Sequence, residues 1–190
     1  MINQKISDSD RAFLLGLARK SIEAATQGKR LDPSDYSQIP TKLMELGASF
    51  VTLTINGALR GCIGTLEAYQ PLYLDVIEHA AAAAMDDFRF NPVQPDEVPA
   101  IRIEISVLSQ PEPLDYTGPD DLLQRLRPGI DGVVIKDGRK RATFLPQVWE
   151  QIPDRQDFLS HLCLKMGASA ELWRTKNLAV YTYQVEEFHE

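Results

Sequence analysis

The stretch VTLTINGALRGCIG, Val51 to Gly64, decides how the first half of this chain is expected to fold. Residues 51–55 alternate apolar and hydroxyl side chains, which predicts a half-buried strand. Asn56-Gly57 follows, and this pair is the strongest short signal for a tight hairpin. The segment 59–63 is therefore expected to return as the antiparallel neighbour of the first strand.

The phase of the return strand decides which side chains share a face. A strict two-residue turn would put Arg60 and Cys62 on the apolar side of the hairpin, whereas a turn longer by one residue puts them beside Thr52. Burying a guanidinium among apolar side chains costs more free energy than inserting one bulge residue. We therefore expect the longer turn, with Leu59 and Ile63 on the apolar face.

The rest of the chain is expected to contain helices and further short strands. Apolar residues at helical spacing predict helices at about 9–27, 42–46, 71–87, 120–126 and 153–166. Alternation and turn signals predict strands at 101–107, 133–136, 141–145 and 180–185, with proline-rich loops at 92–99 and 111–119. Hairpins combined with separate helical segments indicate an α+β fold, with a mainly antiparallel sheet flanked by helices.

Composition places the chain among ordinary globular proteins. It has 190 residues, of which 44% are hydrophobic and 25% charged, so we expect a single domain over 1–190 that has room for two lobes. The longest apolar run, residues 80–85, is far too short to cross a bilayer. The first ten residues do not resemble a secretory signal, and two cysteines 101 positions apart do not suggest a disulfide framework. A cytoplasmic protein with free thiols is expected.

The charge balance bears on the choice of partners. The formal net charge is −7, which weighs against broad, charge-driven binding of nucleic acid. Arg139, Lys140 and Arg141 form a local basic run, which is more typical of a solvated hairpin tip than of a nucleic-acid site.

The segment from Arg60 to Gly64 is chemically the most unusual part of the sequence. Glycine weakens a strand interior, so Gly61 and Gly64 indicate a bulge, or a place where a ligand or another backbone comes close. Arg60 and Cys62 are two residues apart and are expected to point the same way, so the guanidinium would favour the thiolate. The cysteine is then an activated nucleophile or part of a ligand clamp; the alternative is a small buried cysteine in a kinked strand.

The same segment carries a family resemblance. Residues 59–64 read LRGCIG and match the six-residue signature of the AMMECR domain family. Further stretches agree in order and spacing at 87–90, 103–108, 144–148 and 164–167, so the chain resembles this family over nearly its whole length. The resemblance implies an α+β unit with a larger and a smaller lobe and a groove between them near the signature. Prokaryotic members resemble a component of the AmmeMemoRadiSam system, which implies a Memo-like protein and a radical-SAM protein as partners.

The resemblance brings no established reaction, so the roles of the residues remain hypotheses. We expect an enzyme component in which Cys62 is the nucleophile or thiol carrier and Glu104 is a base or orienting carboxylate. Arg60, Gly61, Gly64 and Arg89 would hold a small anionic substrate. Glu104 could instead pair with Arg102 or Arg89, and Arg89 with Asp86 or Asp87. The alternative function is a non-catalytic adaptor that docks a protein partner in the same groove.

The remaining polar residues give no metal or cofactor site. His161 and Cys163 are two positions apart on a predicted helix, which is the wrong spacing for a shared metal ion. Cys163 is expected in the core, and His79 is expected as a polar position on the flank of its helix. No phosphate-binding glycine loop and no iron–sulfur spacing is present, so we expect neither a metal nor a cofactor.

Overall fold

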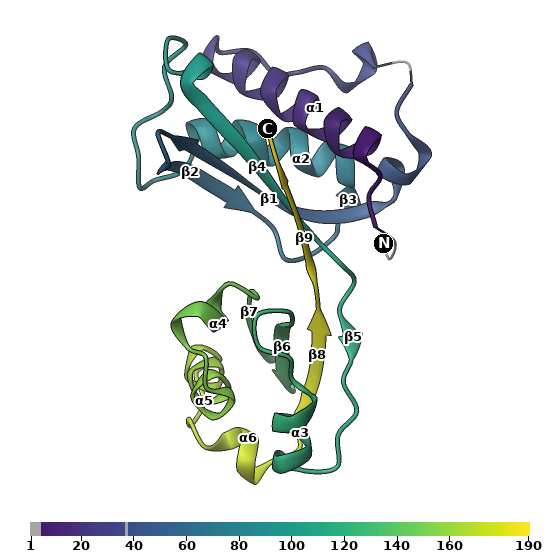
Figure 1. Cartoon of the computed structure of the whole chain (residues 1–190), viewed down its shortest axis with the longest axis vertical. Helices are drawn as coiled ribbons and strands as arrows, with labels where there is room; N and C mark the ends of the chain where they lie inside the picture. Colours follow the sequence, from purple (N-terminus) through teal and green to yellow (C-terminus); the bar gives the residue numbers. More distant parts are fainter. Residues whose placement is uncertain (1–4, 37) are drawn as a thin grey trace. The chain divides into compact units, whose positions relative to one another are not determined.

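The computed structural model describes residues 5–36 and 38–190 and divides the chain into two compact units (Figure 1). Unit 1 consists of the chain up to Ser109 together with Glu186–Glu190, and unit 2 consists of Gln110–Val185. Each unit has helices and an antiparallel pairing of strands, and each has a hydrophobic core of its own. The predicted α+β class is confirmed.

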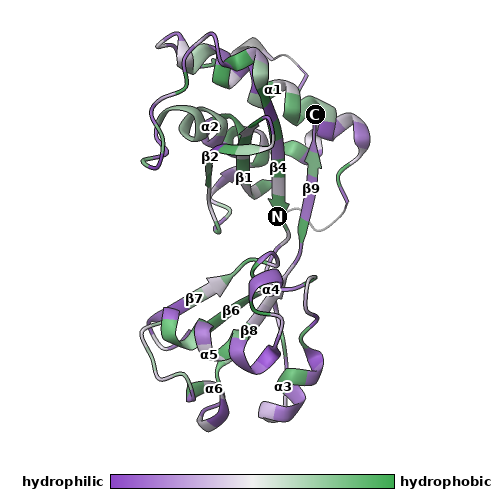
Figure 2. Ribbon diagram, turned by 60° about the vertical axis from the view of Figure 1, so that its left-hand side comes forward, coloured by the Kyte–Doolittle hydropathy of each residue, from purple (hydrophilic) through white to green (hydrophobic). Residues whose placement is uncertain are grey.

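Unit 1 is built on a sheet in the order β2 (Ala58–Gly64), β1 (Leu46–Ile55), β4 (Ile101–Leu108) and β9 (Val185–His189). The short strand β3 (Gln70–Pro71) also pairs with β1. Helices α1 (Asp8–Thr26) and α2 (Leu72–Met85) share one core with the alternate residues of β1 and β4, such as Val51 and Ile103. In Figure 2, hydrophilic residues interrupt the hydrophobic ones along β4, as expected for a strand with one buried face.

The helix ends of unit 1 follow from local chemistry. Ser7 precedes α1 and its hydroxyl accepts a hydrogen bond from the backbone N–H of Asp10, as an N-cap residue does. Gly28 follows α1 with a φ of +70°, which only glycine adopts readily. The expected helix at 42–46 is wrong: a 3₁₀ turn occupies Thr41–Met44, and Leu46 already begins β1. Two further 3₁₀ turns lie at Pro33–Asp35 and Val98–Ala100.

Unit 2 has a sheet in the order β5 (Glu112–Pro113), β8 (Ala179–Tyr183), β6 (Gly132–Asp137) and β7 (Lys140–Phe144). Its helices are α3 (Pro119–Arg125), α4 (Val148–Gln151), α5 (Arg155–Lys165) and α6 (Leu172–Thr175). The rings of Trp149 and Phe158 stack with centroids 3.6 Å apart in this core. The basic run at 139–141 lies at the β6–β7 hairpin, as expected.

The turn of the β1–β2 hairpin is shorter than predicted, but Cys62 still lies beside Thr52 as expected. Ile55 pairs with Ala58, so the turn is the strict two-residue Asn56-Gly57 turn, with both residues at positive φ. The extra residue is Arg60, inserted as a bulge between Leu59 and Gly61. The prediction of a longer turn is therefore wrong, because Asn56 and Gly57 both adopt the positive φ that a two-residue turn requires.

Beyond the bulge, the strand has the predicted phase. Cys62 lies opposite Thr52, and Ile63 lies opposite Val51. Leu59 precedes the bulge, pairs with Thr54 and is 43% exposed, so its expected place on the apolar face is wrong.

Candidate functional site

Arg60 fastens the segment that follows α2 to strand β2. Its Nε and Nη2 atoms donate to the two carboxylate oxygens of Glu97 at 2.8 and 3.0 Å, and its Nη1 donates to the Asn91 carbonyl at 2.9 Å. The hydrogen bond to Arg60 lowers the pKa of Glu97, and the same contact raises the pKa of Arg60. Because the bulge interrupts the alternation at Arg60, the argument that placed its guanidinium beside the Cys62 sulfur does not apply.

The two glycines of the segment mark close approaches of backbone. A Cβ atom on Gly61 would lie 2.1 Å from the carbonyl oxygen of Ala83 in α2, so the helix packs directly against the strand. A Cβ atom on Gly64 would lie 2.4 Å from both the Ser49 carbonyl oxygen and the Phe50 ring. Of the interpretations that the sequence left open, close approach of backbone is what the structure shows at both positions.

Asp87 and Arg89 bind the main chain of Cys62 at the edge of the sheet. The Asp87 carboxylate accepts the Cys62 N–H at 2.8 Å, and Arg89 Nη2 donates to the Cys62 carbonyl at 3.2 Å. Arg89 also donates to Asp87 at 2.6 and 2.9 Å, which confirms the ion pair named as the alternative for Arg89. The pair thus occupies the backbone groups that another strand would use. Chiefly through the Arg89 hydrogen bond, the pKa of the buried Asp87 lies far below its usual value.

The Cys62 sulfur is half-buried and lies among polar groups. The Thr52 hydroxyl donates to it at 3.2 Å. The pKa of Arg89 is raised, mainly by its hydrogen bond to Asp87, with smaller contributions from the Cys62 side chain. Arg89 is therefore the guanidinium that interacts with this sulfur, in the role that the sequence analysis gave to Arg60.

Glu104 lies in the same row of the sheet as Cys62. Thr52 on β1 is opposite Cys62 on β2 and also opposite Glu104 on β4. All three side chains are on the face away from the helices, because their neighbours Val51 and Ile103 are in the core. Strands lie about 4.8 Å apart, so the Cα atoms of Cys62 and Glu104 are roughly 10 Å apart. Thr52 stands between the two predicted catalytic residues.

Cys163 and His79 are both buried and contribute to the interiors of their units. Cys163 is fully buried in unit 2, as expected, and burial raises the pKa of its thiol. His79 is only 6% exposed, so its expected place on an outer flank of the helix is wrong. It pairs with the buried Asp75 at 3.1 Å, and Asp75 also accepts hydrogen bonds from the backbone and hydroxyl of Ser49. This cluster ties α2 to β1 and was missed because Ser49 is distant in sequence.

Residues 5–36 and 38–190 contain no group of three or more histidine, cysteine and acidic side chains that could hold a metal ion. Over the same ranges, no helix is both long enough and apolar enough to cross a bilayer.

The sequence and the fold of this chain are similar to those of known proteins. The AMMECR1 family model matches residues 15–188, and this chain belongs to that family. It is 36% identical to a protein of Thermofilum pendens, with 98% of this chain and 92% of the relative covered. It is 37% identical to a protein of Methanothermobacter thermautotrophicus, with 97% and 96% covered. The crystal structure of the uncharacterized protein PH0010 from Pyrococcus horikoshii is similar, with a TM-score of 0.82, 34% identity, and 98% and 94% coverage.

Proposed function

We propose that this chain is a component of an AmmeMemoRadiSam-type system in which Cys62 acts as a nucleophilic thiol. The observation that carries the proposal is the polar environment of a half-buried sulfur, which accepts a hydrogen bond from Thr52 and interacts with Arg89. A hydrogen-bond donor and a guanidinium are the kinds of neighbour found around nucleophilic thiols. Arg60, Gly61 and Gly64 each have a structural contact that accounts for their residue type. Cys62 points to the face of the sheet away from the helices, where packing does not require a thiol.

The proposed step is attack of the Cys62 thiolate on an electrophilic carbon of the substrate. A new carbon–sulfur bond forms, and the leaving group departs with the electron pair of the bond that breaks. The thiol proton is taken up through water by Glu104, the base proposed on the far side of Thr52 in the same row, because the Thr52 hydroxyl itself donates to the sulfur.

Arg89 is the residue proposed to hold a small anionic substrate near the thiol. Its side chain is 44% exposed, and its contacts to Asp87 and to the Cys62 carbonyl use Nε and Nη2. That leaves Nη1 for an anionic group of the substrate. Arg60 takes no direct part in this version of the site, because Glu97 and Asn91 use its guanidinium.

Alkylation by iodoacetamide tests the proposal. We expect Cys62 to react in the folded chain while the buried Cys163 does not, as read by mass spectrometry of the two peptides. Arg89→Gln should slow the reaction of Cys62 by about tenfold, since loss of one neighbouring charge is worth roughly 1 kcal/mol or more. Arg89→Lys keeps the charge and should recover part of the rate.

Arg102→Gln is the matched control, because Arg102 is an exposed arginine on β4, two strands away from Cys62, with no part in the proposed step. Its rate should stay within about twofold of the wild-type rate. The nucleophile proposal fails if Cys62 is unreactive in the folded chain, or if Arg89→Gln reacts at the wild-type rate.

An adaptor function is the second candidate, and the position of Phe88 favours it. Phe88 is 94% exposed on a turn fixed by the Asp87–Arg89 pair, next to the Cys62 backbone. An exposed aromatic side chain on a turn whose backbone is held in place, beside an arginine, is typical of residues that anchor protein partners. The proposed partners are a Memo-like protein and a radical-SAM protein. Capture of either one that is lost in Phe88→Ala and kept in Cys62→Ser would favour recognition over chemistry.

A further inference from the structure

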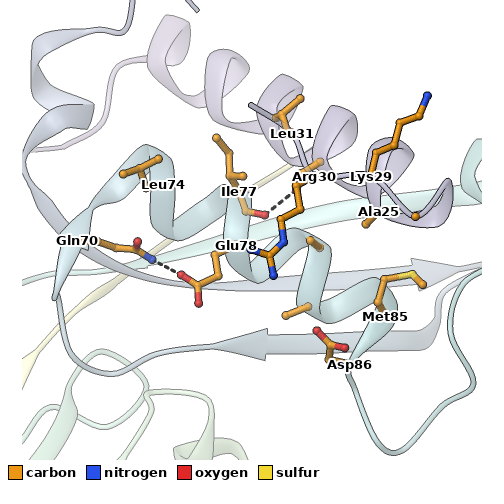
Figure 3. A pocket seen from close by; sticks show the side chains of 14 residues that line it. Ala25, Lys29, Arg30, Leu31, Gln70, Leu74, Ile77, Glu78, Met85 and Asp86 are labelled. Atoms are coloured by element: carbon orange, nitrogen blue, oxygen red, sulfur yellow. Dashed lines mark hydrogen bonds between the residues drawn. The ribbon is translucent and has the colours of Figure 1, made fainter. Parts of the chain in front are cut away.

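A hollow of about 710 Å³ lies between the end of α1 and the outer side of α2 in unit 1 (Figure 3). Its floor is made of small and apolar side chains, chiefly Ala25 from α1 and Ile77, Ala81, Ala82 and Met85 from α2. The three alanines leave open a seam that larger side chains would close. The volume is in the range of small-molecule sites, which is about 300–1,000 Å³. The residues that line this hollow are separate from the row of Cys62, Thr52 and Glu104.

Two cations line one side of this hollow, and in Figure 3 Arg30 points into it whereas the Lys29 ammonium points outward at the rim. Lys29 and Arg30 follow the left-handed Gly28 at the end of α1, and Figure 3 shows Arg30 reaching over the floor toward Glu78. Within the part of the chain that the structure describes, neither Lys29 nor Arg30 forms an ion pair. By contrast, Arg60 and Arg89, which the sequence analysis proposed as anion-binding residues, form ion pairs with Glu97 and Asp87, respectively.

Two acidic residues also line the hollow, and one of them is already engaged. The Glu78 carboxylate accepts hydrogen bonds from Gln70 at 2.6 Å and from the Tyr69 hydroxyl at 3.1 Å. Partial desolvation of its hydroxyl, followed by this contact, raises the pKa of Tyr69 to about 12. Asp86 is exposed and stands at the C-cap of α2, beside Met85 in Figure 3. Asp86 forms no ion pair among the described residues either, so an anionic ligand is expected on the side of the hollow that Lys29 and Arg30 occupy, away from both carboxylates.

We propose that this hollow binds an organic anion, a carboxylate or phosphate group attached to an apolar body. The anionic group lies on Arg30, with Lys29 adding positive charge at the rim, and the apolar body lies on Ala81, Ala82 and Met85. A chain with a net charge of −7 repels anions in general, so a pair of unused cations over an apolar floor selects a ligand that supplies both features. This inference uses other residues than the proposed thiol chemistry and stands or fails separately from it.

Titration of the full chain with decanoate, followed by NMR of the backbone amides, tests the inference. Saturable shifts are expected at Ala81, Ala82 and Gly28, with decylamine failing to produce them at the same concentration. Inorganic phosphate alone should bind more weakly than decyl phosphate, since it lacks the apolar body. Binding of either decanoate or decyl phosphate supports the inference. The one that binds more tightly shows whether the hollow prefers a carboxylate or a phosphate headgroup.

Three variants complete the test. Arg30→Gln should weaken binding of decanoate by about tenfold, as expected for loss of one charge-assisted hydrogen bond. Ala81→Leu fills the floor with a strong helix former and should abolish binding without lowering the melting temperature. Arg139→Gln, at the exposed β6–β7 turn, should bind as the wild type does. Equal binding of decylamine, wild-type affinity in Arg30→Gln, or shifts confined to another surface would overturn the inference.

Discussion

Replacing Gly61 with alanine should destabilise unit 1, because β2 and α2 touch there through their main chains. The added Cβ atom would lie 2.1 Å from the Ala83 carbonyl oxygen, whereas real Cβ contacts are longer than 3.0 Å. Helix and strand must therefore separate by about 0.9 Å, and the opposing atom is backbone that cannot rotate away. Overpacking of a core costs about 1–3 kcal/mol, and we expect the upper end here.

A second glycine in the same unit gives the matched control. Gly16 is inside α1, and a Cβ atom there would meet nothing within 4 Å. Gly16→Ala should therefore stabilise unit 1 by about 0.5–1 kcal/mol, since alanine is the better helix former.

Thermal unfolding followed by circular dichroism measures both effects. A change of 1 kcal/mol shifts the melting temperature of a chain this size by roughly 2–4 °C, so Gly61→Ala should melt about 6–12 °C lower. Gly16→Ala should melt slightly higher than the wild type. If Gly61→Ala melts within 2 °C or so of the wild type, the direct contact between β2 and α2 is refuted.

Three other predictions concern contacts on both units. The pKa of Asp87 is lowered in the folded chain, so its stabilisation is complete above pH 4 or so and is lost as the pH falls below the unfolded value. Urea unfolding should therefore show a gap between wild type and Asp87→Asn at pH 7 that narrows below pH 4. Arg60→Ala should release the segment 91–97 and raise its amide exchange, while Cys62 is still alkylated. Phe158→Ala should lower the stability of unit 2 by about 3–5 kcal/mol in denaturant unfolding, since its ring stacks on Trp149.

Local patterns predicted the elements whose sequence carries both a period and an end signal. Helix α1 was expected at 9–27 and lies at Asp8–Thr26, since its apolar stripe, serine cap and Gly28 agree. Helix α2 was expected at 71–87 and lies at Leu72–Met85. Strand β4 was expected at 101–107 and runs one residue further. These elements are specified by neighbours within a few residues.

The parts that sequence reasoning missed depend on contacts between distant residues. The bulge at Arg60 is fixed by Glu97, which is 37 positions away, and the turn alone gives no sign of it. Strand β9 at Val185–His189 joins the sheet of unit 1 although the preceding strand β8 belongs to unit 2. The expected final strand at 180–185 therefore covers most of β8 (Ala179–Tyr183) and only the first residue of β9. Single-turn helices such as α4 are too short to show a period.

The residues of the candidate site were proposed from their types, but their arrangement in space could not be predicted from the sequence. The sequence selected Cys62 and Glu104, and the register places them in one row with Thr52 between them. The choice of guanidinium was different: Arg89 interacts with the sulfur, and Arg60 holds the segment that follows α2. Alternation along a strand could not reveal this, because a single inserted residue changes which side chains share a face.

The most direct measurement is the rate at which iodoacetamide alkylates Cys62 at pH 7 in the folded wild-type chain and in Thr52→Val. A sulfur that accepts the Thr52 hydroxyl should react readily in the wild type and several-fold more slowly once that donor is gone, with Cys163 protected in both. Equal rates in the two chains, or a Cys62 that reacts only after unfolding, would contradict a functional thiol and leave the motif as a purely architectural joint.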